Sequence, residues 1–395
     1  MVVHSDFPSD VRVAREVAAA AEAGFDVTVI ALRRDGQPPR EQIAGADVHR
    51  LPLSHKRGVS ALHLAAEYLA FTLLATLRVA KLTLRRPFDV VQVHNPPDFL
   101  IVAALVPKLR GARVIFDVHD LSSDMFAMRF PRRAAGVATP ILHAVERAAT
   151  RSSDLVVTVH EPYRAELVRR SVPERKTLVV LNSLAESLLP TPVPPPEQEP
   201  FRIVYHGTVT PHYGVALAVE AMAGLQAGGR PVSLEIFGTG DAVGALRERA
   251  AELRLGGVVT ISDRYLDHQE VLSEIAGASV GIVPNLPTRL NRFALSTKLF
   301  EYIALGIPAV CSDLPTLREY FGPDEVMFFT AGDPDALRAA LEEIANNPNA
   351  AQARADAARR RAQDYSWGAN RSVFIGTLRD AVARRERNGR ATGGE

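Results

Sequence analysis

Short apolar runs alternate with stretches of helical periodicity along almost the whole chain, and this alternation constrains the fold more than any other feature. Buried parallel strands joined by covering helices produce such a pattern, so an α/β protein is predicted. The expected strands are 2–4, 26–32, 89–94, 113–119, 154–160, 177–181, 201–206, 232–237, 257–262, 279–284, 307–311 and 326–329. The expected helices are a first one from about Asp10 to Gly24, then 214–226, 241–253, 268–276, 298–305, 334–345 and 350–363.

A proline-rich segment divides this pattern into two similar halves. Residues 189–200 read Leu-Pro-Thr-Pro-Val-Pro-Pro-Pro-Glu-Gln-Glu-Pro, which can continue neither a helix nor a central strand and favours an extended chain. The length of 395 residues also exceeds what one hydrophobic core normally serves. We therefore expect two Rossmann-like domains at 1–185 and 201–368, joined by a linker at 186–200.

Composition and charge exclude several classes of protein. The formal net charge of +1 provides no overall field that would attract nucleic acid. The one cysteine, Cys311, allows no internal disulfide and no cysteine-rich metal site, and it suits a reducing compartment. Residues 1–6 have neither the basic region nor the apolar core of a secretory signal, so a cytoplasmic protein is expected.

One apolar segment, at 59–80, is long enough to raise the question of a membrane. It carries His63, Glu67 and Arg78, which would be costly at the centre of a bilayer, so a buried core helix is the favoured interpretation. Basic residues flank the segment at both ends. The alternative is therefore a surface helix that makes peripheral contact with the inner face of the membrane through 53–86.

Histidines stand at the carboxyl ends of predicted strands in both halves of the chain. They are His4, His94, His119, His160 and His206. Ligands of open α/β sheets bind at this edge. One histidine at such a position is more often structural than catalytic, but five at the same edge favour a polar cleft between the two domains.

A polar loop that leads directly into a helix is the second sign of a binding site. It contains Ser296, Thr297 and Lys298, and Glu301 follows on the same face of the helix. The free amides of the first turn, the helix dipole and the Lys298 ammonium would together bind an anion. A carboxylate at Glu301 could accept the hydroxyls of a ribose, as acidic residues do in dinucleotide-binding folds. The alternative is a capped helix with a Lys–Glu pair on its surface.

Two glycine loops and one acidic motif complete the candidates. The strand at 201–206 ends in His206-Gly207-Thr208, where Gly207 would let the backbone approach a ligand closely. The glycine turn at 237–241 lacks the full dinucleotide fingerprint, so NAD is not expected. The motif Asp333-Pro334-Asp335 has the Asp-x-Asp form of metal-dependent sugar transferases, but it suits a helix start with Asp333 as the N-cap. No metal site is expected.

These residues resemble the retaining GT-B glycosyltransferases of family 4, the glycosyl transferases group 1. The resemblance spans nearly the whole chain, and the segments that carry it are Asp10-Val-Arg12-Val-Ala-Arg15-Glu16, Val93-His94-Asn95-Pro96, Phe116-Asp117-Val118-His119-Asp120, Tyr205-His206-Gly207-Thr208, Lys298-Leu-Phe-Glu301-Tyr and Tyr365-Ser366-Trp367. It implies an N-terminal acceptor-side domain and a C-terminal nucleotide-sugar-binding domain that face each other across a cleft. It also implies that a helix at 369–388 returns to the N-terminal domain, followed by a disordered tail at 389–395.

The resemblance implies a role for each candidate residue. Glu301 would hold the donor ribose, Lys298 the diphosphate, and His119 the donor sugar near the bond that breaks. Arg264 would lie beside the nucleobase. The other residues expected at the donor are His206, Gly207, Thr208, His212, Ser296 and Thr297, and those expected in the sugar and acceptor cleft are His94, Asn95 and Asp120.

The implied activity is a hexosyl transfer from a nucleoside-diphosphate sugar, such as a UDP-sugar, to an acceptor hydroxyl, with retention of configuration and without metal or other cofactor. The acceptor would be a sugar, a lipid-linked glycan or a small molecule, as in bacterial polysaccharide or glycoconjugate synthesis. Two residues depart from the family pattern: Phe293 replaces a usual glutamate, and His212 replaces a stronger cation on the diphosphate. A catalytically silent nucleotide-binding paralogue and a nucleotide-sugar epimerase or phosphorylase of the same fold therefore remain as alternatives.

Overall fold

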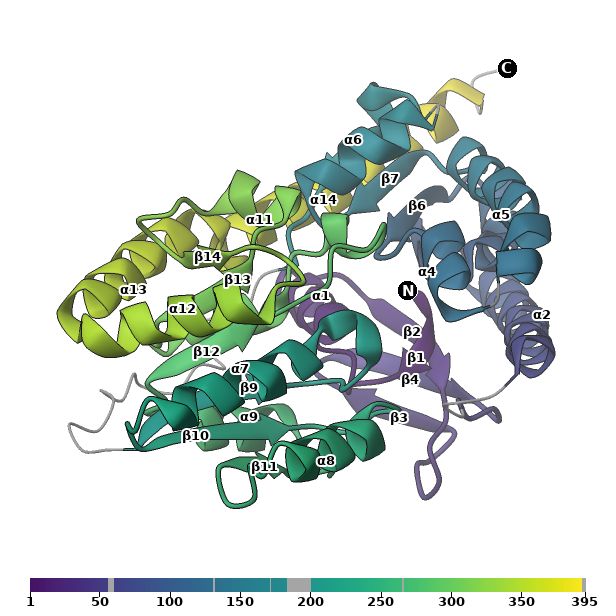
Figure 1. Cartoon of the computed structure of the whole chain (residues 1–395). Coiled ribbons are helices and arrows are strands. Elements are labelled where there is room, and N and C mark those ends of the chain that lie inside the picture. The colour runs from purple at the N-terminus through teal and green to yellow at the C-terminus, as the bar shows by residue number, and fades with distance from the viewer. Residues whose placement is uncertain (56–59, 131, 171, 183–199, 265, 393–395) are drawn as a thin grey trace. The chain divides into compact units, whose positions relative to one another are not determined.

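The structure is a computed structural model that describes residues 1–55, 60–130, 132–170, 172–182, 200–264 and 266–392 (Figure 1). The chain forms two compact units, one of Met1–Asn182 with Gly368–Glu395, and the other of Ser183–Trp367. Each unit is an α/β domain with a parallel sheet, so the predicted class of two Rossmann-like domains is confirmed. The linker expected at 186–200 lies, except for its last residue, outside the described residues.

The first unit contains an eight-stranded sheet in the order β3-β4-β2-β1-β5-β6-β7-β8. Its strands are β1 (Val2–Asp6), β2 (Val27–Leu32), β3 (Arg40–Ile43), β4 (Ala46–Leu51), β5 (Val90–His94), β6 (Arg113–Val118), β7 (Leu155–Thr158) and β8 (Thr177–Val179). All neighbours pair in parallel except β3 and β4, which form an antiparallel hairpin at the edge of the sheet. The expected strands did not include this hairpin, because β3 is short, polar and largely exposed, and it therefore lacks an apolar pattern.

Helices surround this sheet and include the last helix of the chain. They are α1 (Val11–Glu22), α2 (Ala61–Arg85), α3 (Leu105–Leu109), α4 (Ser122–Arg129), α5 (Arg132–Ser152), α6 (Glu161–Arg169) and α14 (Trp367–Thr392), with 3-10 turns η1 (Asp98–Ala104) and η2 (Glu174–Lys176). Helix α14 is held to the first unit by Leu181, whose amide donates to Asn370 Oδ1 at 2.8 Å, and by the Arg371–Glu22 ion pair at 2.9 Å.

Helix α14 continues to Thr392, so the disordered tail expected from 389 is wrong for residues 389–392. The segment after Arg384 contains no proline. The single Gly389 costs a helix only about 1 kcal/mol relative to alanine, which is not enough to end it. Residues 393–395 lie outside the described part of the chain.

The second unit contains a six-stranded, wholly parallel sheet in the order β11-β10-β9-β12-β13-β14. Its strands are β9 (Phe201–His206), β10 (Val232–Phe237), β11 (Val259–Ile261), β12 (Val280–Val283), β13 (Ala309–Ser312) and β14 (Met327–Phe329). Its helices are α7 (Val215–Ala227), α8 (Val243–Glu252), α9 (His268–Ile275), α10 (Thr297–Ala304), α11 (Pro315–Tyr320), α12 (Pro334–Asn346) and α13 (Pro348–Ala362), with 3-10 turns η4 (Pro211–Tyr213), η5 (Asn291–Phe293) and η6 (Gln363–Tyr365). Every strand expected in this half is present.

The packing of α10 on this sheet depends on a glycine. A Cβ atom at Gly281 of β12 would lie 2.4 Å from the Tyr302 ring, so only glycine leaves room for the ring at this point. The buried Tyr302 hydroxyl also donates to the Val204 carbonyl of β9 at 3.3 Å. These contacts fix α10 against β9 and β12, the two strands between which the strand order reverses.

Candidate active site

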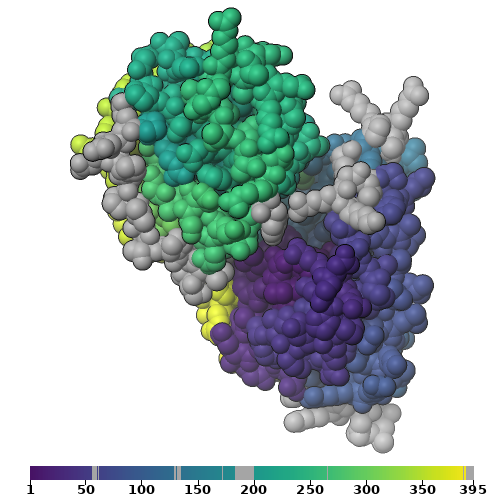
Figure 2. Space-filling view, turned by 90° about the horizontal axis from the view of Figure 1, so that it is seen from below, coloured from purple at the N-terminus to yellow at the C-terminus, as the bar shows by residue number. Residues whose placement is uncertain are grey.

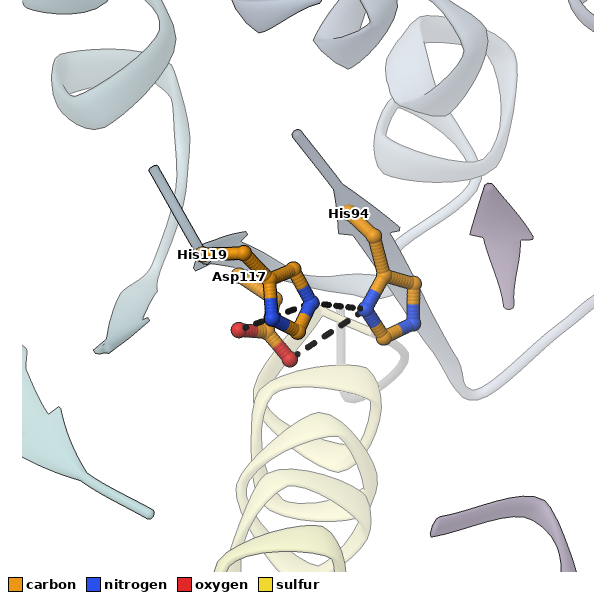
Figure 3. Close-up of side chains that lie close together, drawn as sticks. All are labelled: His94, Asp117 and His119. Carbon is orange, nitrogen blue, oxygen red and sulfur yellow. Dashed lines mark hydrogen bonds and ion pairs between the residues drawn. The ribbon is translucent and has the colours of Figure 1, made fainter. Parts of the chain in front are cut away.

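Three buried side chains meet at the carboxyl ends of β5 and β6 in the first unit (Figure 3). His94 Nδ1 lies 3.0 Å from His119 Nε2 and 3.3 Å from Asp117 Oδ2. His119 Nε2 lies 3.6 Å from Asp117 Oδ1, and the two imidazole rings stack at an angle of 19°. The two histidines of this group were predicted from their positions at strand ends. Asp117 was noted only as part of the family motif.

The charges of this cluster are set by burial and by Gln92. The Gln92 amide donates to Asp117 Oδ2 at 2.7 Å and to Glu16 Oε2 at 2.8 Å. Burial, reinforced by the nearby Asp117 charge, raises the pKa of Glu16 to about 7. Burial opposes the charge of Asp117 too, but His119, His94 and Gln92 hold the pKa of Asp117 below its usual range.

The tautomer of His119 follows from these contacts. Burial lowers the pKa of His119 to about 3, so the ring is neutral and carries one proton. A proton on His94 Nδ1 can be shared by Asp117 and His119 Nε2, which places the remaining proton of His119 on Nδ1. Among the described residues this Nδ1 atom has no hydrogen-bond partner. His119 Nδ1 is therefore available to donate a hydrogen bond to a ligand.

Asn95 serves as a brace rather than as an open ligand. Its Oδ1 accepts from the backbone amides of His119 at 2.7 Å and Asp120 at 3.2 Å. Its Nδ2 donates to Asp98 Oδ1 at 2.8 Å and to the Asp120 carbonyl at 2.7 Å. Burial raises the pKa of Asp98 to about 6. Asp98 was not among the expected site residues, because it lies two residues beyond the end of the motif that contains Asn95.

Arg12 brings a positive charge to the same neighbourhood. It forms a bidentate pair with Asp10, with both contacts at 3.1 Å. Its field favours the charged forms of Asp120 and Asp117, which shows that the start of α1 lies near the His94–Asp117–His119 cluster. Burial nevertheless raises the pKa of Asp120. Arg12 was quoted in the N-terminal motif but was given no role, because its position beside the histidines depends on the fold.

The donor atoms of His94, Asp117 and His119 lie within 4.8 Å of one another, so this set could hold a metal ion. Within the described residues these atoms are paired with one another. The absence of a metal requirement therefore stays a prediction. The Asp333 motif is explained: Asp333 Oδ1 accepts from the amides of Asp335 at 2.9 Å and Ala336 at 3.1 Å, which confirms the predicted N-cap.

The other two histidines of the first sheet have structural contacts. His4 Nε2 lies 3.0 Å from the buried Glu67 of α2, and its ring meets Phe71 edge-on. His160 is the N-cap of α6, where its Nδ1 accepts from the Tyr163 amide at 3.2 Å. These contacts account for both side chains without a ligand.

In the second unit, α10 carries Lys298 and Glu301 toward the end of β9. Glu301 is buried, with Oε2 2.9 Å from His206 Nε2 and Oε1 3.6 Å from His268 Nδ1. The Lys298 ammonium lies over the rings of Tyr213, at 4.6 Å, and Tyr205, at 5.3 Å. His268 was not expected, yet it opens the first helix after β11 and so stands at the ligand-binding edge.

Burial tunes Lys298 and a glycine makes room for it. Burial lowers the pKa of Lys298 to about 8, although Glu301 favours the charged form. Gly207 has φ +103°, and a Cβ there would lie 2.8 Å from Lys298 Cε. At Gly238 a Cβ would lie 1.8 Å from the Gly207 carbonyl oxygen. The loops after β9 and β10 therefore pack back to back beneath the lysine.

The first turn of α10 has no side-chain cap. Ser296 is the N-cap residue but forms no hydrogen bond to the amides of that turn, and Thr297 is exposed. Because Glu301 is buried and paired with histidine, the structure contradicts the alternative of a capped helix with a surface Lys–Glu pair. What remains is a helix start without a side-chain cap beside an ammonium group, which is an arrangement that binds anions.

Thr208 and His212 lie in the loop that follows β9. The Thr208 carbonyl accepts from the Tyr205 hydroxyl at 2.7 Å. His212 Nδ1 lies 3.0 Å from Thr210 Oγ1. Burial lowers the pKa of His212, and the field of Lys298 lowers it further, so the ring is neutral near Lys298 at pH 7.

Arg264 and Phe293 have other surroundings. The Arg264 side chain is 55% exposed and pairs with Glu274 at 3.2 Å and Glu270 at 3.8 Å. These contacts do not join it to the Lys298–Glu301 cluster. Phe293 is buried in η5, where the Arg292 guanidinium lies 4.5 Å above the ring. No carboxylate therefore stands at this position.

Comparison with known proteins defines the class. Residues 9–183 match the family described as glycosyl transferase 4-like domain, and residues 192–361 match glycosyl transferases group 1. Each unit is thus a glycosyltransferase domain, and the protein is a glycosyltransferase of the GT-B fold. Since the two matches together span most of the sequence, the chain belongs to the family 4 glycosyltransferases that carry the group 1 domain.

Several similar proteins match this chain over most of its length and over most of their own. Glycogen synthase of Mycobacterium tuberculosis (strain CDC 1551 / Oshkosh) is 26% identical over 365 residues, which cover 88% of this chain and 85% of that protein. Sucrose-phosphate synthase from Thermosynechococcus elongatus superposes with a TM-score of 0.76 at 21% identity, covering 97% of this chain and 96% of that one. HepE of Anabaena in complex with UDP-glucose superposes with a TM-score of 0.66 at 14% identity, covering 96% and 98%. The predicted class of enzyme is confirmed.

Proposed function

We propose that the protein transfers a sugar from a nucleoside-diphosphate sugar to an acceptor hydroxyl, with retention of configuration and without a metal ion. The observation that carries this proposal is the uncapped first turn of α10 beside Lys298, with the buried carboxylate of Glu301 one turn further on. This arrangement offers an anion site and a hydroxyl acceptor on one helix, as a nucleoside diphosphate requires. The UDP and UDP-glucose of the HepE structures make UDP the first nucleotide to test.

Lys298 would stabilise the leaving diphosphate. Negative charge accumulates on the phosphate oxygen as the sugar–phosphate bond breaks, and a positioned cation beside bare helix amides stabilises that charge. The half-buried ammonium needs no reorganisation, because the Tyr205 and Tyr213 rings already hold it in place. The neutral His212 would contribute a hydrogen bond rather than a charge.

Glu301 would bind the ribose through hydroxyl hydrogen bonds. Its Oε2 atom lies 2.9 Å from His206 Nε2, and a carboxylate can accept several hydrogen bonds, so it could also accept from the ribose hydroxyls. His206 and His268 lie beside the carboxylate and hold it in orientation. Arg264 remains the proposed neighbour of the nucleobase, which requires that it leave its surface pair with Glu274.

His119 would donate a hydrogen bond from Nδ1 to the donor sugar, since Asp117 and His94 fix the proton there. The acceptor hydroxyl would attack from the face that the diphosphate leaves, so that the anomeric configuration is kept. Glycosidases use a flanking pair of carboxylates instead. Asp120, whose pKa is raised by burial, would lie on the acceptor side with Asn95 as the brace of this loop.

A panel of nucleoside diphosphates and their sugars tests donor binding. A ligand that binds the folded state raises the melting temperature by mass action, so the preferred nucleotide should give the largest shift. The same preparation is then assayed for release of nucleoside diphosphate from the sugar donor, with and without EDTA. Turnover that survives the chelator supports the metal-free mechanism, whereas loss that magnesium or manganese restores contradicts it.

The same panel distinguishes an active transferase from a catalytically silent paralogue. Its support is Phe293, a buried aromatic ring where the family usually places a carboxylate. Such a protein would bind nucleotide yet release none from any sugar donor.

A further inference from the structure

Exposed apolar side chains gather on one group of elements in the first unit. Among the described residues, all exposed large apolar side chains except Val373 belong to α2, η1, α3, α4 and α5. None lies in the second unit. Single exposed apolar residues are ordinary, but a concentration on neighbouring elements marks an interaction surface.

Helix α2 contributes the largest part of this surface. Leu62, Leu69, Leu73, Leu77 and Leu84 recur at intervals of four or seven residues and are each 59% or more exposed. The opposite face packs into the unit through Phe71, Ala75 and Val79, which are buried. The favoured prediction of a buried core helix is therefore correct for one face only, since an entire apolar stripe faces outward.

Helix α2 lies on the unit rather than acting as a separate spanning segment. Residues 62–85 are long and apolar enough to cross a membrane, and 28% of the apolar window is buried. However, the buried Glu67 pairs with His4 of β1 at 3.0 Å and with His55 at 2.8 Å. These polar contacts and the buried face tie α2 to the sheet.

The neighbouring elements extend the leucine stripe into a broader face. The turn η1 contacts both α2 and α5, α3 contacts α2, and α4 packs against α5. Helices α2, α4 and α5 lie together beside the first sheet (Figure 1). Leu105 and Leu109 of α3 and Val137 and Ile141 of α5 are exposed on these elements. In Figure 2 the blue atoms of this part of the sequence form a continuous part of the surface of the first unit.

The charges around this face have one sign. In 61–86, 98–112 and 122–152 the acidic residues are Glu67, Asp98, Asp124 and Glu146, and all four are buried. The exposed charged residues include Arg78, Lys81, Arg85, Arg86, Lys108 and Arg110. The acids are neutralised internally, for example by Arg170, which pairs with Asp124 at 2.7 Å and Glu146 at 3.0 Å. The exposed charges on these elements are therefore basic, although Arg86 at the end of α2 pairs with the exposed Asp26 at 2.6 Å.

We propose that this face, called here the leucine face, docks on a bilayer that contains anionic lipid. The exposed leucines would enter the boundary between headgroups and acyl chains, and the basic rim would meet the lipid phosphates. A second copy of the chain fits less well, because it would bring two basic rims together. The inference does not depend on the glycosyl transfer, since vesicle binding is read without substrate.

Vesicle flotation tests the proposal with the full chain. Vesicles of phosphatidylcholine with about 30% phosphatidylglycerol, at about 0.1 M salt, should carry the protein to the top of the gradient. Vesicles of phosphatidylcholine alone should bind it at least tenfold less. No binding to either kind of vesicle would overturn the proposal.

Variants separate the two contributions. Leu69→Ser/Leu73→Ser/Leu77→Ser should weaken binding at least tenfold with an unchanged melting temperature, because all three side chains are exposed. Lys81→Glu/Arg85→Glu should remove the preference for anionic vesicles. Val373→Ser, at an exposed apolar position of α14, is the matched control and should bind like the parent. Lipid docking would be refuted if the triple variant bound vesicles as well as the parent. It would also be refuted if the parent were a dimer, and the triple variant became a monomer without any change in vesicle binding.

Discussion

Replacing Lys298 and Glu301 separately distinguishes binding from chemistry at α10. Glu301 is proposed to hold ribose hydroxyls equally in the ground state and the transition state. Glu301→Ala should therefore weaken nucleoside diphosphate binding by about 1.5–3 kcal/mol, or roughly 10- to 150-fold, as for a hydrogen bond to a charged group. The rate at saturating donor should change less than the affinity.

Lys298 is proposed to meet charge that grows as the sugar–phosphate bond breaks. Lys298→Ala should lower kcat as well as affinity, with a barrier increase of about 3–4 kcal/mol, comparable to the loss of one oxyanion donor. The ammonium already lies over the rings of Tyr205 and Tyr213, which hold it in position for this role. Lys298→Arg tests shape, since a guanidinium keeps the charge but is wider.

Calorimetry with UDP, melting temperature and donor turnover should be measured for each variant. Arg247→Ala is the matched control, because it removes an exposed cation of the same unit that pairs with Asp263. A surface pair would contribute only about 0.3–0.5 kcal/mol to stability and nothing to kinetics. If Lys298→Ala and Glu301→Ala bind and turn over like the parent, the anion-site reasoning is refuted.

Three further outcomes are expected. Burial lowers the pKa of Lys298 to about 8, and the protonated form is the one that binds the diphosphate. UDP affinity measured by calorimetry should therefore be constant below pH 8 and fall above it. Lys298→Arg should flatten this pH profile. Arg170→Met should lower the free energy of unfolding by about 3–5 kcal/mol in urea titration, because Asp124 and Glu146 would stay buried without their cation; a loss below 1 kcal/mol would contradict this. Asp333→Ala should cost about 1 kcal/mol of stability through the lost cap of α12 and leave donor turnover unchanged in the presence of EDTA.

The sequence was sufficient for most of the second unit. Every strand expected there is present, because buried parallel strands are continuous apolar runs that few other structures produce. The edge hairpin of the first unit was missed, since Arg40 of β3 finds its partner Asp47 only across the hairpin. Such cross-strand pairs leave no periodic pattern in the sequence.

Site residues were predictable where a motif or a strand end placed them. His94, His119, Lys298 and Glu301 were placed in the candidate site in this way, and their roles stay predictions. His268 was missed, because it comes within 3.6 Å of Glu301 only through the packing of α9 and α10 on one sheet. Periodicity predicted that the α2 segment is apolar. It could not show which face of the helix is covered, because that depends on the packing of α2 against η1, α3 and the strands β1, β2 and β4.

The two ends of the chain belong to one folded unit, and this has a consequence for synthesis. Arg371 of α14 pairs with Glu22 across 349 positions of sequence, whereas Ser183–Trp367 form a continuous stretch. The second unit is in this sense an insertion within the first. A ribosome therefore completes the second unit before it has made α14, the last helix of the first unit. Until then the first unit lacks the helix that covers one side of its sheet. Removal of α14 should harm the host while leaving the insertion able to fold alone.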